Sequence, residues 1–108
     1  YDRYINNLKN IKDINYIPTN LDQTSPWFID IYVKDPENLA AYLELHNIGT
    51  RHIYPPIHSQ KAYEYLNHLV FSNTEKYSST GLWLPSSIKL TDSQIDYICN
   101  YIYKYYDK

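Results

Sequence analysis

The chain has 108 residues, of which 44% are hydrophobic and 20% charged, and it carries a net charge of −2. This length suffices for one globular domain and leaves no room for a second complete one. The slight acidic excess argues against binding to nucleic acid, which requires clustered Lys and Arg. No apolar run reaches the roughly 18 residues of a membrane span. With a single cysteine, Cys99, the composition fits a soluble protein of the reducing cytoplasm.

The first element predicted is a helix over residues 1–14. Its apolar side chains recur at helical spacing, at Tyr1, Tyr4, Ile5, Leu8 and Ile11. No capping residue precedes Tyr1, so we interpret residues 1–14 as the end of a longer interdomain helix and the chain as a fragment. Residues 15–26 are then a polar connection, and residues 27–108 form a small domain.

A strand is predicted for Trp27–Val33 because apolar and more polar side chains alternate there. Its apolar face would consist of Trp27, Ile29, Ile31 and Val33. Such alternation is typical of a sheet that helices cover on one face only.

The next helix is predicted to start at Asp35 and Pro36, an N-cap residue followed by proline in the first turn. Its buried stripe would consist of Leu39, Tyr42, Leu43 and His46. We expect Gly49 to end this helix in the left-handed conformation. A short strand at Thr50–Tyr54 and a helix at Ser59–Leu69 should follow.

Two capping boxes predict the last helix starts, one at Ser72 with Glu75 and one at Thr91 with Gln94. A brief strand at Leu82–Leu84 lies between them and ends at a proline. The apolar stripe of the final helix consists of Ile95, Ile98, Cys99 and Ile102. Cys99 therefore reads as a core residue rather than a nucleophile. This order of elements predicts an α+β or small α/β layer domain.

Polar residues gather in the segment Asn47–Tyr63, NIGTRHIYPPIHSQKAY. Pro55 and Pro56 fix their own φ at about −65°, so neighbouring side chains leave this turn in defined directions. The turn could serve as a binding site or as a structural corner. The four histidines lack the spacing of a zinc site, and neither a strained serine turn nor a glycine-rich phosphate loop is present. The residues alone indicate a polar pocket wall without a catalytic apparatus.

Four motifs, in order, resemble the C-terminal small domain of the pyridoxal-phosphate-dependent nucleotide-sugar aminotransferases of the DegT/StrS family. They are IGTR at Ile48–Arg51, YPPIHSQKAY at Tyr54–Tyr63, TEKYSSTGLWLPSS at Thr74–Ser87 and LTDSQIDYICNYI at Leu90–Ile102. The N-terminal helix is similar to the family helix that joins the large and small domains. The resemblance implies part of a fold-type I transferase, a short sheet covered by helices, with the large cofactor-binding domain outside this chain.

The resemblance also implies a function. In viosamine and perosamine synthases, ping-pong transamination moves an amino group, with glutamate as the donor, to a nucleotide-linked 4-keto-6-deoxy sugar. The Schiff-base lysine of this family belongs to the large domain. We therefore expect no catalytic residue in this chain and no activity from it alone, but a homodimer with active sites at the subunit interface for the complete enzyme. The alternative is a non-catalytic binding or regulatory module that keeps this fold, and a third possibility is an α+β domain without a ligand.

Three residues of the turn are predicted to bind the substrate: Arg51, Tyr54 and His58. The planar guanidinium of Arg51 suits a pyrophosphate or a carboxylate, although an ion pair within the domain is the competing interpretation. Tyr54 could pack against the sugar or lie in the core. His58 could contact the sugar or merely hold the proline turn. Trp83 is assigned to the core.

Overall fold

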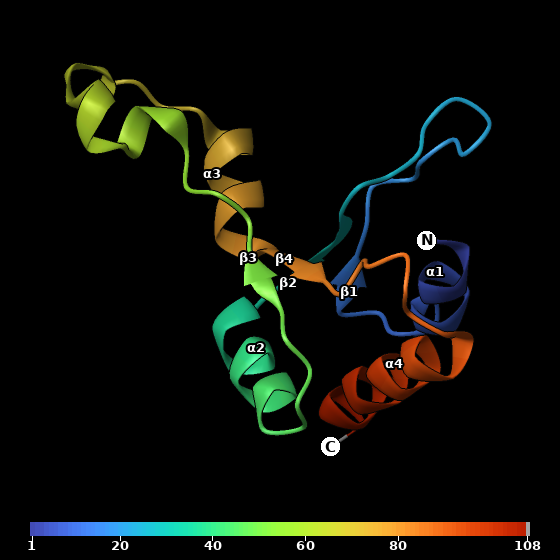
Figure 1. Cartoon of the computed structure of the whole chain (residues 1–108). Coiled ribbons are helices and arrows are strands. Elements are labelled where there is room, and N and C mark those ends of the chain that lie inside the picture. Colours follow the sequence, from blue (N-terminus) through green and yellow to red (C-terminus); the bar gives the residue numbers. More distant parts are fainter. Residues whose placement is uncertain (108) are drawn as a thin grey trace.

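A four-stranded antiparallel sheet lies at the centre of the computed structural model, which describes residues 1–107 (Figure 1). Its strands, in spatial order, are β1 (Ile14–Asn15), β2 (Ile29–Val33), β4 (Gly81–Leu84) and β3 (Arg51–His52). The helices are α1 (Asp2–Leu8), α2 (Pro36–Glu44), α3 (Ser72–Thr80) and α4 (Asp92–Tyr106), with 3-10 helices at Ile57–Ser59 and Lys61–Leu66. The predicted α+β class is confirmed. Among the described helices, none is both long and apolar enough to span a bilayer.

The hydrophobic core fills the space between one face of the sheet and helices α1, α2 and α4. Ile31 of β2 pairs with Leu82 of β4, and both side chains are fully buried. The other large, fully buried side chains are Tyr4, Leu8, Leu39, Leu43 and Ile102. Because successive strand residues point to opposite faces, Asp30 and Tyr32 lie on the second face of the sheet.

Helices α2 and α4 begin where the sequence predicts. The Asp35 carboxylate accepts a hydrogen bond from the amide of Asn38, at 3.1 Å. Thr91 and Gln94 form a complete capping box at the start of α4. These bonds satisfy amides that the first turn of each helix leaves without a partner.

Helix α2 ends at Glu44, and the left-handed residue that follows it is Asn47, not Gly49 as predicted. Asn47 has a φ of 58°, whereas no glycine within residues 1–107 has a positive φ. The amide of Ile48 donates to the carbonyl of Leu43 at 3.0 Å, and the amide of Asn47 donates to Glu44 at 2.9 Å. Asparagine tolerates the left-handed region better than other non-glycine residues. The prediction identified the helix end but assigned it to the wrong residue.

The capping box predicted at Ser72 is wrong. Helix α3 includes Ser72 as its first residue, and its N-cap, Phe71, makes no side-chain cap bond. Glu75 does reach back, because its Oε1 accepts from the amide of Phe71 at 3.4 Å. Only one half of the predicted capping box is therefore present at the start of α3.

The N-terminal segment differs from the predicted helix over residues 1–14. Helix α1 ends at Leu8, and Ile14 pairs with Val33 as the edge strand β1. Ile11 and Ile14 are nevertheless buried in the core. Pairing with β2 gives the backbone of this segment the hydrogen-bond partners that it would otherwise have found within a longer helix.

Strand β2 begins at Ile29 rather than at the predicted Trp27. The last residue of β4 is Leu84, which pairs with Ile29, and Pro85 follows. Because proline has no N–H, the ladder does not continue to residues 27 and 28. Trp27 is 82% exposed and does not join the apolar face.

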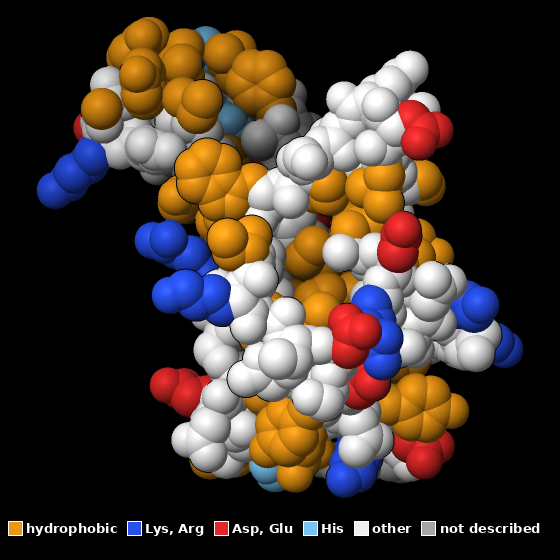
Figure 2. Space-filling model, turned by 45° about the vertical axis from the view of Figure 1, so that its right-hand side comes forward, with side chains coloured by type: hydrophobic (Ala, Val, Ile, Leu, Met, Phe, Trp, Pro, Cys, Tyr) orange, Lys and Arg blue, Asp and Glu red, His pale blue; other side chains and the backbone are white. Residues whose placement is uncertain are grey.

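Residues 53–71 form a projecting arm between β3 and α3 (Figure 1, yellow-green). The helix predicted at Ser59–Leu69 is instead two 3-10 helices with a kink at Tyr63. The radius of gyration of 15.2 Å exceeds the roughly 13 Å of a compact domain of this length. Figure 2 shows hydrophobic side chains gathered over this arm at the upper left. Its exposed large hydrophobic residues are Tyr54, Ile57, Tyr63, Tyr65, Leu69, Val70 and Phe71.

The two glycines provide a matched pair for testing the packing of β4. A Cβ on Gly81 would overlap the side chain of Ile53 and lie 2.8 Å from the carbonyl oxygen of Tyr77, whereas a Cβ on Gly49 would meet nothing within 4 Å. We expect Gly81→Ala to destabilise the protein by about 1–3 kcal/mol. Gly49→Ala should be neutral or stabilising by up to about 1 kcal/mol. Thermal unfolding of both variants checks this, and equal stabilities would contradict it.

An exposed ion pair joins α1 to α4 and predicts a pH dependence. Arg3 donates to both carboxylate oxygens of Asp96, at 2.8 and 2.6 Å, and Asn7 donates to Oδ1 at 2.9 Å. These hydrogen bonds, Arg3 first, hold the pKa of Asp96 below its usual value. The stabilisation is fully present above the unfolded pKa of about 3.9 and is lost as the pH falls through the lower folded pKa. Unfolding measured against pH should therefore show that wild type is more stable than Asp96→Asn near neutral pH and that this difference in the free energy of unfolding shrinks in acid. A difference that stays constant with pH would contradict this.

Candidate functional site

Arg51 lies at the edge of the sheet, on the face opposite the core. It pairs with Trp83 of β4, which in turn pairs with Asp30 of β2. Directly paired residues of antiparallel strands project to the same side of the sheet. Asp30, Trp83 and Arg51 therefore form one row across three strands.

Arg51 and Tyr54 come together at the start of the projecting arm. The guanidinium carbon of Arg51 lies 5.7 Å from the centroid of the Tyr54 ring, within the range of a cation–π contact. Tyr54 is 59% exposed, so it is not a core residue. Within residues 1–107, Arg51 makes no ion pair that would occupy its guanidinium. Its charge is available to an anionic ligand.

His58 is directed at helix α3 rather than at Arg51 and Tyr54. It is the only buried polar residue among those described, and its Nε2 lies 3.3 Å from Oε1 of Glu75. Its ring also packs against Phe71, with the centroids 5.0 Å apart. These contacts fasten the proline turn to α3, which is the structural alternative considered for this histidine.

Trp83 is buried, as the sequence predicted, but it packs outside the main core cluster. It is 8% exposed and packs on the second face of the sheet, where Phe28 stacks on it with a 4.0 Å centroid distance and an interplanar angle of 6°. Tyr54 meets the same indole edge-on at 5.0 Å. The Tyr54 ring therefore packs on the indole of Trp83.

Asp30 is a residue of this face that the sequence reasoning missed. Burial raises the pKa of its carboxyl, and a hydrogen bond from the side chain of Trp83 partly offsets the rise. Its Oδ1 is buried without a hydrogen-bond partner in the described chain. The alternation of Phe28, Asp30 and Tyr32 along β2 was the available signal, because it placed all three on one face.

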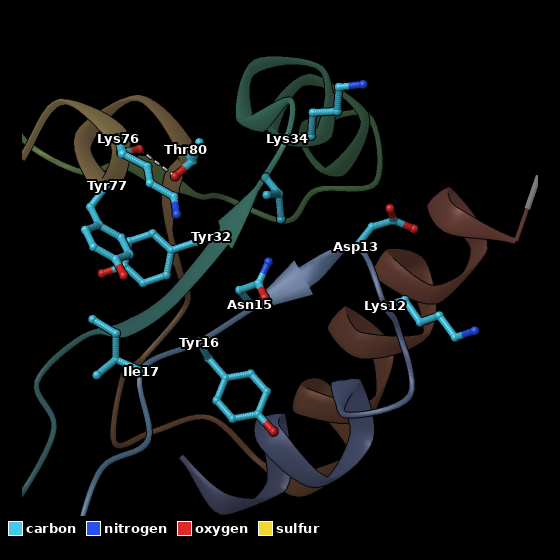
Figure 3. A pocket seen from close by; sticks show the side chains of 11 residues that line it. Lys12, Asp13, Asn15, Tyr16, Ile17, Tyr32, Lys34, Lys76, Tyr77 and Thr80 are labelled. Atoms are coloured by element: carbon cyan, nitrogen blue, oxygen red, sulfur yellow. Dashed lines mark hydrogen bonds between the residues drawn. The ribbon is translucent and has the colours of Figure 1, made fainter. Parts of the chain in front are cut away.

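A separate cavity of about 510 Å³ opens beside β1, β2 and α3 (Figure 3). None of the predicted site residues lines it. Tyr32 and Tyr77 meet edge-to-face there at 4.9 Å, and Lys76 lies beside them, whereas Lys12 and Lys34 point away. A single converging charge does not make this cavity a built anion site.

The structure also places Cys99 and the side chains that could bind a metal ion. Cys99 is buried in the core, and burial raises its pKa to about 11, so its thiolate is scarce at neutral pH. Across residues 1–107, no three His, Cys, Asp or Glu side chains group closely enough to hold a metal ion.

Comparison with known proteins supplies the family. The model of the DegT/DnrJ/EryC1/StrS aminotransferase family matches residues 1–103. The chain belongs to this family. GDP-perosamine synthase of Vibrio cholerae is 35% identical over 72 residues, which cover 66% of the chain but 20% of that enzyme.

Solved structures of the DegT/DnrJ/EryC1/StrS family share the fold. A Brucella abortus member superimposes with a TM-score of 0.84 at 24% identity, covering 99% of this chain and 29% of its own. A Streptococcus pneumoniae homologue, described as a sugar aminotransferase in its PMP form, gives a TM-score of 0.80 at 20% identity over 98% of this chain and 29% of its own. The chain thus spans less than a third of the length of these relatives.

Proposed function

We propose that this chain is the C-terminal part of a pyridoxal-phosphate-dependent aminotransferase. The enzyme would transfer an amino group from glutamate to a nucleotide-linked 4-keto-6-deoxy sugar. The observation that carries the proposal is the family match over residues 1–103, together with the perosamine synthase relative. Residues 27–108 would be the small domain, and residues 1–14 would lead into it from the large domain.

Within the small domain, Arg51 and Tyr54 would form the wall that binds the nucleotide sugar. Arg51 would hold the diphosphate, because its planar fork matches phosphate oxygens and no ion pair in the described chain competes for it. Tyr54 would pack against the sugar with its exposed ring. His58, which the sequence predicted as a third residue of this wall, would support it indirectly, by holding the proline turn against Glu75 of α3.

The cofactor would be held elsewhere in the complete enzyme. Pyridoxal phosphate supplies the electron sink for transamination and needs a Schiff-base lysine in a desolvated pocket. Every lysine within residues 1–107 is exposed. We therefore assign the cofactor and its lysine to the large domain, and we expect this chain alone to be inactive. The complete enzyme would be a cytoplasmic homodimer with its sites at the subunit interface.

The test is amino transfer by the longer protein that carries this chain and the large domain. It is loaded with pyridoxal phosphate and given glutamate labelled with ¹⁵N and a nucleotide-linked 4-keto-6-deoxy sugar. Mass spectrometry should find the label in an amino sugar nucleotide. Binding of the nucleotide sugar without any labelled product would favour the alternative, a non-catalytic module.

A further inference from the structure

Four aromatic rings form a continuous aromatic platform on the second face of the sheet: Trp27, Phe28, Trp83 and Tyr54. The centroid distances between successive rings are 5.9, 4.0 and 5.0 Å. The first two contacts are stacked and the third is edge-on. Trp27 is 82% exposed, and Phe28 and Tyr54 are also exposed, so the platform presents open aromatic surface to solvent.

The platform is held rigidly from below. Trp83 is fixed by the pairing of its backbone with Asp30 and Arg51 and by the burial of its side chain, which is 8% exposed. Phe28 lies nearly parallel on that fixed indole. A ligand ring that stacks beside Phe28 would therefore meet a side chain that is already ordered, which lowers the entropic cost of stacking.

A positive charge flanks the platform on one side. Arg51 lies opposite Trp83 in the neighbouring strand, so their backbones are separated by about 5 Å. A ligand that fits must combine a flat ring with an anionic group a short distance away. This charge distinguishes the platform from the arm, whose exposed side chains around Val70 and Phe71 are apolar.

We propose that the aromatic platform stacks the nucleobase of the nucleotide sugar at its Trp27 and Phe28 end, with the diphosphate at Arg51. This inference rests on the proposed function, because it assigns one part of that substrate to one surface. The face is uncovered in the described chain, and the complementarity of ring and charge selects a nucleotide over an apolar protein segment. Tyr54, at the far end of the platform, remains free for the sugar.

The test is calorimetric titration of the cofactor-loaded longer protein with guanosine, uridine and thymidine diphosphates. Removing a base-stacking aromatic typically costs about 5- to 100-fold in affinity. We expect Trp27→Leu to lower the affinity for the tightest-binding of the three diphosphates by that factor. Trp27→Phe should restore most of this affinity. Trp27 is exposed, so these variants should fold. Tyr65→Leu, which removes a 70% exposed ring from the arm, is the matched control and should change nothing.

Three outcomes would overturn the inference: equal affinities for wild type and Trp27→Leu, an equal loss in Tyr65→Leu, or no nucleotide binding at all. Acrylamide quenching of Trp27 fluorescence tests whether a protein segment, rather than a nucleotide, covers the platform. If Trp27 is already shielded from acrylamide before any nucleotide is added, protein covers the platform and the inference is wrong. The ¹⁵N assay on the same preparations separates the two proposals. If the amino group is transferred but Trp27→Leu leaves nucleotide affinity unchanged, this inference is wrong and the proposed function still holds.

Discussion

Replacing Leu43 with alanine should lower the free energy of unfolding by about 2–5 kcal/mol. Leu43 is 0% exposed and lies in the core between α2, the sheet and α4. Leu45, two residues further on, is 81% exposed, and Leu45→Ala makes the same chemical change at the surface. Its effect should stay within about 0.5 kcal/mol.

Urea unfolding of both variants measures this difference, with unchanged m-values as the condition for comparing midpoints. Similar losses in Leu43→Ala and Leu45→Ala would contradict the placement of the core. A large loss in Leu45→Ala alone would mean that the stripe of α2 faces the other way.

Replacing Arg51 with alanine in the longer protein should raise the KM for the nucleotide sugar by about 10- to 100-fold. Charge-assisted hydrogen bonds of the kind that Arg51 would make to a diphosphate are worth about 1.5–3 kcal/mol. Arg51→Lys should recover part of the loss, because lysine keeps the charge but not the planar fork. Affinity for pyridoxal phosphate should remain near normal.

His52→Ala is the matched control for Arg51. His52 pairs with Leu82 and lies on the opposite face of the same short strand. Steady-state kinetics of the three variants would show whether KM responds to Arg51 specifically. An unchanged KM in Arg51→Ala, or an equal rise in His52→Ala, would remove Arg51 from the substrate wall.

The sequence predicted those elements whose side-chain pattern matched their final surroundings. The stripes of α2 and α4 and the alternation of β2 were identified because each packs one apolar face on the same core. Local periodicity could not show that Ile14 pairs with Val33, since that contact joins segments 19 residues apart. The helix predicted at Ser59–Leu69 was wrong for a related reason, because the large apolar side chains of this segment, such as Tyr63 and Leu69, are exposed in the described chain rather than packed on its core.

The candidate site was predictable in part. Clustering of Arg51 and Tyr54 followed from their closeness in sequence, and they do come together. Asp30 and Trp83 join them only through the register of three strands, which a single sequence does not reveal. The burial of His58 against Glu75 could not be predicted, because it depends on how α3 packs beside the proline turn.

The most direct test of the substrate wall is a crystal structure of the longer protein with a bound nucleotide sugar. Diphosphate oxygens should lie about 3 Å from the guanidinium nitrogens of Arg51, and the sugar should pack against Tyr54. A nucleotide sugar bound elsewhere, with Arg51 paired to a protein carboxylate, would contradict the account.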